Sequence, residues 1–117
     1  MTKTNIIISF QVEGFHCWPD APKEVAFLRD NHRHMFWIEA EKEVKHDDRD
    51  IEIIMFKREI QAKLLFKYGG NNGELILGSK SCEMLAKEIL EEFDCERVKV
   101  TEDNENGAVV YKVTVLQ

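Results

Sequence analysis

Three of the chain's four histidines lie within one stretch, Gly14–Phe36, which reads GFHCWPDAPKEVAFLRDNHRHMF. His16 ends a segment in which apolar and polar residues alternate, and the pair His32 and His34 opens a second segment of this kind. Side chains two positions apart on a β-strand lie on the same face of a sheet. The alternation therefore predicts that all three imidazoles point to the apolar face of two strands.

Three imidazoles on a partly buried face are typical of a metal site. Three protein nitrogens with one open position are the arrangement of a catalytic zinc site. The same spacing also fits histidines that are only hydrogen-bonded near a core, so spacing alone leaves both interpretations open. It does not separate zinc from iron or nickel either, because imidazole binds all three metals.

The composition is that of one globular domain covering residues 1–117, with 44% hydrophobic and 32% charged residues. No apolar run is long enough to span a membrane, and the N-terminal residues lack a signal-peptide pattern. The net charge is −6 without a basic patch, which disfavours nucleic acid as a partner. Three cysteines without a CxxC pair are expected to be reduced thiols, and we expect a cytoplasmic protein.

Six elements are predicted in the order strand, strand, helix, helix, strand, strand. The predicted strands are Asn5–Val12, Met35–Val44, Arg97–Glu102 and Ala108–Leu116, and the predicted helices are Ile51–Tyr68 and Ser81–Asp94, with Ser81 as N-cap. Lys23–Asn31 is expected to be a loop, with one helical turn as an alternative, and the first residues of the first helix, Ile51–Ile54, can also be extended. Gly69–Lys80 is expected to be an irregular connection, and Asn106-Gly107 a hairpin turn. This order predicts an α+β domain, an antiparallel four-stranded sheet with two helices on one face.

Three local motifs together resemble one known family. They are the histidines His16 and His32-Arg-His34, the segment Ser81-Cys-Glu-Met-Leu-Ala86, and the strand end Val98-Lys-Val-Thr-Glu102. With the order of elements, they resemble the 6-pyruvoyl-tetrahydropterin and 6-carboxytetrahydropterin synthases, which have the T-fold (tunnelling fold). The resemblance covers nearly the whole chain. It implies that the three histidines are zinc ligands and that the ligand is a pterin- or purine-like small molecule.

Glu102 is the residue that would recognise this ligand. The resemblance implies that its carboxylate binds the amino-pyrimidinone edge of a pterin. Glu83 is a second candidate ligand-binding residue. Independently, Glu102 is in phase with two predicted core valines, and a buried carboxylate needs a partner. A ligand with two N–H donors would satisfy it. An ion pair with Arg or Lys, or a shift of register that exposes Glu102, is the alternative.

The chain also departs from the family. Leu28 occupies the position of a family cysteine, Arg33 replaces a glycine between the paired histidines, and Gly69–Lys80 lacks the family's Asp-His pair. His46 lies twelve residues beyond His34, about 40 Å along an extended strand, and is not expected at the same site. Acid–base groups that remain near the predicted metal are Cys17, Asp20, Glu24 and Asp30, none of them at a family position.

Three functions therefore stay open. The first is a zinc-dependent enzyme acting on a pterin or purine-derived substrate. The second is a non-catalytic T-fold protein that binds a nucleotide, pterin or base through Glu102, and the third is a purely structural oligomer. A four-stranded sheet leaves two unpaired edges, which favours association. The resemblance implies a homo-oligomer, a trimer or hexamer, in which sheets join into a barrel with sites between subunits.

Overall fold

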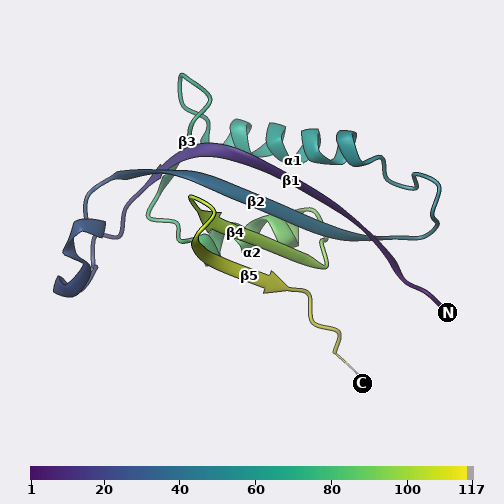
Figure 1. Ribbon diagram of the computed structural model, residues 1–117. Coiled ribbons are helices and arrows are strands. Elements are labelled where there is room, and N and C mark those ends of the chain that lie inside the picture. The colour runs from purple at the N-terminus through teal and green to yellow at the C-terminus, as the bar shows by residue number, and fades with distance from the viewer. Residues whose placement is uncertain (116–117) are drawn as a thin grey trace.

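The alternating segments on either side of the histidine-rich stretch form one long antiparallel hairpin. In a computed structural model of the protein, which describes residues 1–115, its strands are β1 (Thr4–His16) and β2 (His32–Val44). Their register runs unbroken from the pair Thr4 and Val44 to the pair His16 and His32. Both strands are longer than the predicted segments and extend through the histidines, as the alternation indicates. Figure 1 shows β1 and β2 as two long neighbouring strands.

The sheet has five strands in the order β3-β1-β2-β4-β5, with β3 at Leu75–Gly78, β4 at Arg97–Glu102 and β5 at Asn106–Tyr111. The α+β class and the order of the six predicted elements are confirmed, but the prediction of an irregular Gly69–Lys80 was wrong. This segment contains β3, which pairs in parallel with the last residues of β1. A four-residue strand between glycine- and asparagine-rich segments is too short for its alternation to stand out in the sequence.

The hairpin between β4 and β5 turns earlier than predicted. Asp103 and Asn104 adopt the left-handed conformation, with φ of 56° and 57°, and the N–H of Glu105 donates to the carbonyl of Glu102. Asp and Asn tolerate this conformation better than most residues. Gly107 lies within β5, where a Cβ atom would come within 2.5 Å of the Thr101 Cα, so glycine permits close strand approach. The predicted last strand also ends early, and its final residue lies outside the described residues.

Two α-helices cover one face of the sheet: α1 (Ile53–Tyr68) and α2 (Cys82–Glu92) (Figure 1). The side chain of Glu52 caps α1 by accepting from two backbone N–H groups, and Ser81 caps α2 as predicted. α1 begins at Ile53, within the segment 51–54 that could also be extended, and α2 ends at Glu92, slightly before the predicted end and within the usual spread of helix boundaries. A short 3-10 helix, η1 (Lys23–Leu28), lies in the loop between β1 and β2.

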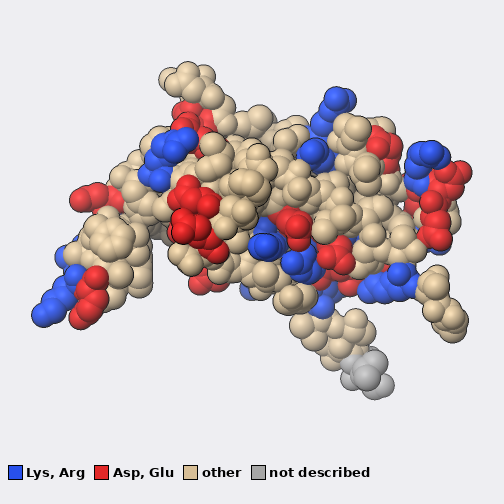
Figure 2. All heavy atoms as spheres, viewed as in Figure 1, with Lys and Arg blue, Asp and Glu red and all other residues tan. Residues whose placement is uncertain are grey.

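The core lies between the helices and one face of the sheet. Its most deeply buried side chains come from both layers: Phe36, Ile38, Val98 and Val100 from the sheet, and Ile60, Leu85 and Ile89 from the helices. On the other face, Arg97 forms ion pairs with Glu39 and Glu41. In Figure 2 acidic and basic side chains are interspersed over the visible surface. Within residues 1–115, no helix is both long and apolar enough to cross a membrane.

Candidate metal centre

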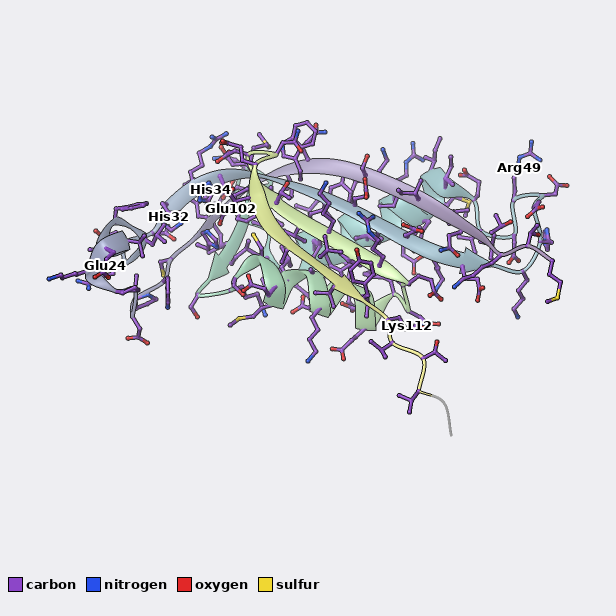
Figure 3. The ribbon with its side chains drawn as sticks, turned by 60° about the horizontal axis from the view of Figure 1, so that its bottom comes forward. Glu24, His32, His34, Arg49, Glu102 and Lys112 are labelled. Atoms are coloured by element: carbon purple, nitrogen blue, oxygen red, sulfur yellow. The ribbon has the colours of Figure 1, made fainter. Side chains whose placement is uncertain are left out.

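Strand pairing brings the predicted site residues together at one end of the sheet. His16 is the last residue of β1 and lies opposite His32, the first residue of β2. His34 follows two positions along β2, and Phe36, two positions further, pairs with Glu102 at the end of β4. All these positions share one side of the sheet because they are in phase across paired strands. Figure 3 shows His32, His34 and Glu102 beside one another at this end of the sheet.

The four side chains form a compact cluster. One nitrogen or oxygen atom from each of His16, His32, His34 and Glu102 lies within 4.8 Å of all the others. The imidazole centroids of His16 and His32 are 4.6 Å apart, and those of His32 and His34 are 5.0 Å apart. The Oε2 atom of Glu102 is 2.8 Å from Nε2 of His16 and 3.6 Å from Nε2 of His34.

Each imidazole of this cluster is oriented by an oxygen acceptor at its Nδ1 atom. The acceptors are the carbonyl of Lys80, 2.9 Å from His16, the carbonyl of Asp30, 2.8 Å from His32, and the carboxylate of Asp103, 2.7 Å from His34. Carbonyl and ionised carboxylate oxygens only accept hydrogen bonds, so each Nδ1 carries a proton. In a neutral imidazole the lone pair is then on Nε2.

Two of these Nε2 atoms have surroundings that a cation would satisfy. Nε2 of His34 is buried and has no hydrogen-bond partner within residues 1–115. Nε2 of His16 faces a carboxylate oxygen of Glu102, so two acceptors meet at 2.8 Å. Leaving a buried acceptor unpaired costs about 1–3 kcal/mol. Neighbouring ligands of a tetrahedral zinc ion lie about 3.3 Å apart, given bonds of about 2.0 Å. The 2.8 and 3.6 Å separations bracket this value, so the donor set fits a zinc-sized ion.

Asp103 supports the cluster from outside. It accepts from Nδ1 of His34 and, at 3.0 Å, from the backbone N–H of Met35. These two hydrogen bonds lower the pKa of Asp103 and keep its carboxylate ionised. Carboxylates and carbonyls on the outer nitrogens of metal-binding histidines orient the rings and raise their basicity. The Lys80 and Asp30 carbonyls and Asp103 supply this support to all three rings.

An apolar floor lies beneath the histidines. The buried ring of Phe36 packs edge-on against His16 and His34, with centroids 5.2 and 5.8 Å apart. A Cβ atom on Gly14 would come within 2.8 Å of this ring, so glycine makes room for it. Cys82, the first residue of α2, is also buried, and burial together with the charge of Glu102 raises its pKa to about 12. Its sulfur therefore stays a protonated thiol and is not one of the four clustered groups.

The predicted acid–base residues lie elsewhere. None of Cys17, Asp20, Glu24 and Asp30 places its side chain in the cluster. Asp20, Glu24 and Asp30 are exposed on the loop that projects beyond the sheet, where Figure 3 shows Glu24 well away from Glu102. Cys17 is half-buried and donates its backbone N–H to the Gly78 carbonyl. Asp30 contributes only its carbonyl, through His32.

Sequence reasoning missed the supporting residues. In a continuing strand, Asp103 would point away from Glu102, but the left-handed turn brings its carboxylate back to His34. The carbonyl of Lys80 carries no sequence signal at all. Glu83 is exposed in the first turn of α2 and lies outside the cluster. The alternative in which Glu102 pairs with Arg or Lys is not observed within residues 1–115, where its carboxylate lies beside the Nε2 atoms of His16 and His34.

Comparison with solved structures identifies the architecture. A 6-pyruvoyl tetrahydropterin synthase from Caenorhabditis elegans matches with a TM-score of 0.67 over 97% of this chain and 98% of that chain. The fold is a T-fold. An uncharacterized protein from Wolinella succinogenes, WS1659, matches with a TM-score of 0.62 over 97% of this chain and 100% of that one. The sequence identities are 8% and 12%, so the likeness concerns the fold alone. No protein-family profile and no curated protein matches the sequence.

Proposed function

We propose that the protein binds a transition metal ion, zinc in the first place, and a pterin- or purine-like small molecule beside it. His16, His32 and His34 hold the metal through their Nε2 atoms. The observation that carries the proposal is that these imidazoles have their Nδ1 protons engaged outward and their lone pairs turned inward. The likeness in fold to a 6-pyruvoyl tetrahydropterin synthase supports the ligand class.

The chain's own residues would orient the metal and the organic ligand. The imidazole rings are oriented by the carbonyls of Lys80 and Asp30 and by the carboxylate of Asp103. The ring of Phe36 packs against His16 on the core side of the site. Glu102 is partly exposed beside the histidines, so its carboxylate can accept N–H groups from a heterocycle. A bound zinc ion would polarise a ligand carbonyl or hydroxyl, or lower the pKa of a bound water.

Binding without synthase turnover is the version of this function that we favour. General acid–base groups must lie within hydrogen-bond reach of the reacting proton. The side chains of Cys17, Asp20, Glu24 and Asp30 are outside the cluster, and Cys82 stays protonated. We therefore expect little or no conversion of dihydroneopterin triphosphate by the zinc-loaded protein. Rapid conversion would make the protein an enzyme of this class and would overturn the binding-only version.

The second part of the proposal is a homo-oligomer, a trimer or hexamer. β3 covers only the Gly14–His16 end of β1, so within residues 1–115 most of β1 pairs with a strand on one side alone. β5 forms the other edge of the sheet and exposes Val109 and Tyr111. Long unpaired edges favour association, and closing sheets into a barrel removes them. In such an assembly the exposed loop between β1 and β2 can contribute to the wall of a neighbouring site.

Calorimetric titration with neopterin and with guanosine tests the ligand class directly. The zinc-loaded wild-type protein should bind at least one of these probes, and His34→Ala should lose both zinc and probe. His46→Ala is the matched control, because His46 is an exposed histidine in the turn after β2. Absence of binding by zinc-loaded wild-type protein would contradict the ligand class. Binding that His34→Ala leaves unchanged would contradict the location.

A further inference from the structure

We infer that Glu102 is a fourth protein ligand of the metal, so that the site is a three-histidine, one-carboxylate centre. The inference rests on the proposed metal site and changes the role that the resemblance gives to Glu102. Its Oε2 atom lies 2.8 Å from Nε2 of His16 and 3.6 Å from Nε2 of His34. Such distances are typical of two ligand atoms bound to one metal ion. They are too short for an organic ligand to lie between the Glu102 oxygen and the imidazole nitrogens.

A proton alone does not satisfy this arrangement. A proton on Nε2 of His16 would make a hydrogen bond to Glu102. Nε2 of His34 would still be buried without a partner, 3.6 Å from the same oxygen. One cation at the centre of the cluster satisfies both lone pairs and the carboxylate at once. A neutral imidazole and a carboxylate are both ligands that zinc accepts.

The backbone holds Glu102 in this position. Glu102 pairs with Phe36 of β2 on one side and with Asn106 of β5 on the other, so its backbone is fixed between two strands. The next residue, Asp103, holds His34 from outside. Two consecutive residues therefore act on the metal, one directly and one through a histidine. The start of the β4–β5 turn becomes part of the metal centre.

Four protein ligands have a functional consequence. Structural zinc sites are closed by four protein ligands, whereas catalytic sites keep a position for water or substrate. An organic ligand must then add as a fifth ligand, displace Glu102, or bind to the second oxygen of its carboxylate. In each case Glu102 links metal affinity to ligand affinity, and this coupling is reciprocal. Such a site also fits the weak synthase turnover proposed above.

The test compares metal affinity and cobalt spectra of apo-protein variants. The variants are Glu102→Gln, which keeps the size of the side chain, Glu102→Asp, which shortens its reach, His34→Ala, and the control Glu105→Gln at an exposed residue of the same hairpin. Zinc affinity is measured by competition with a chromophoric chelator, and Co²⁺ is the spectroscopic probe. Changes at outer-shell residues already cost about 10–100-fold in metal affinity, so loss of a direct ligand should cost at least about tenfold.

The expected pattern separates this inference from the proposed function. Both Glu102 variants should bind zinc at least about tenfold more weakly and change the visible Co²⁺ spectrum, while Glu105→Gln matches wild type. Circular dichroism establishes that each variant is folded, and Glu102→Asp decides the matter if Glu102→Gln does not fold. Wild-type affinity and spectrum in the Glu102 variants, with binding lost in His34→Ala, would overturn the carboxylate ligand only. Failure of the wild-type protein to bind zinc would overturn both.

Discussion

Gly14→Ala tests how the sheet supports the histidine cluster. Gly14 pairs with His34 across the β1–β2 ladder, and an added Cβ would lie 2.8 Å from two carbons of the Phe36 ring. Ordinary contacts of this kind are 3.4–4 Å. Phe36 is 1% exposed, so its ring cannot move into solvent and must press on its neighbours. Those neighbours include His16 and His34, which lie edge-on to the ring.

The size of the effect follows from this overlap. Overpacking a filled core costs about 1–3 kcal/mol. For a chain of this length, 1 kcal/mol corresponds to about 4 °C in melting temperature, so Gly14→Ala should lower it by about 4–12 °C. A functional constellation tolerates displacements of only about 0.5 Å. A ring shift of several tenths of an ångström at Phe36 should therefore also weaken zinc binding, by about tenfold.

A double-mutant cycle with Phe36→Leu provides the assay. Leucine lacks the ring atoms that the new methyl group meets, so Gly14→Ala should cost less in the Phe36→Leu background than in wild type. Free energies of unfolding are measured by chemical denaturation of the apo-proteins, and zinc affinity by chelator competition. Additive costs of the two substitutions would refute the contact argument. An unchanged zinc affinity in Gly14→Ala would refute the claim that Phe36 positions the histidines.

Asp103→Asn should weaken zinc binding about 10–100-fold without removing a ligand, while Asp20→Asn, on the exposed loop, should not. Hydrogen bonds lower the pKa of Asp103 in the folded state, so the stability that they contribute is present at neutral pH and is lost as the pH falls below about 4. The free energy of unfolding of Asp103→Asn should therefore decrease less than that of the wild-type protein when the pH is lowered through this range. Burial raises the pKa of Cys82 to about 12 and of Cys95 to about 11, so a thiol reagent at pH 8 should label Cys17 first and all three cysteines only after unfolding. Light scattering at micromolar concentration should give a trimer or hexamer, and a stable monomer that still binds zinc would contradict the barrel.

Period-two alternation predicted the central part of the fold because these strands have one buried face. Ile38 and Ala40 are buried while Glu39, between them, pairs with Arg97 on the other face. Because the same alternation continues to the strand ends, it also predicted the face on which the histidines lie. Three histidines from two separate strands could therefore be placed on one face of the sheet from the sequence alone.

The rest depends on interactions that a single sequence does not encode locally. β3 is defined by its pairing with the end of β1 and not by its own four residues. The support given by Asp103 depends on a left-handed turn, and the Lys80 and Asp30 carbonyls are backbone atoms present at every residue. The contact between Glu102 and the histidines arises only when β4 pairs with β2 at one register. Alternation along a strand predicts on which face of the sheet a side chain lies, whereas the register of strand pairing determines which side chains it contacts.

The most direct test of the account is the metal content of untagged protein purified without chelator. Elemental analysis by mass spectrometry should give about one transition metal ion, zinc in the first place, per chain. His34→Ala should retain little of it, and His46→Ala should retain all of it. Wild-type protein that contains no metal and takes up none from an equimolar zinc solution would contradict the metal centre.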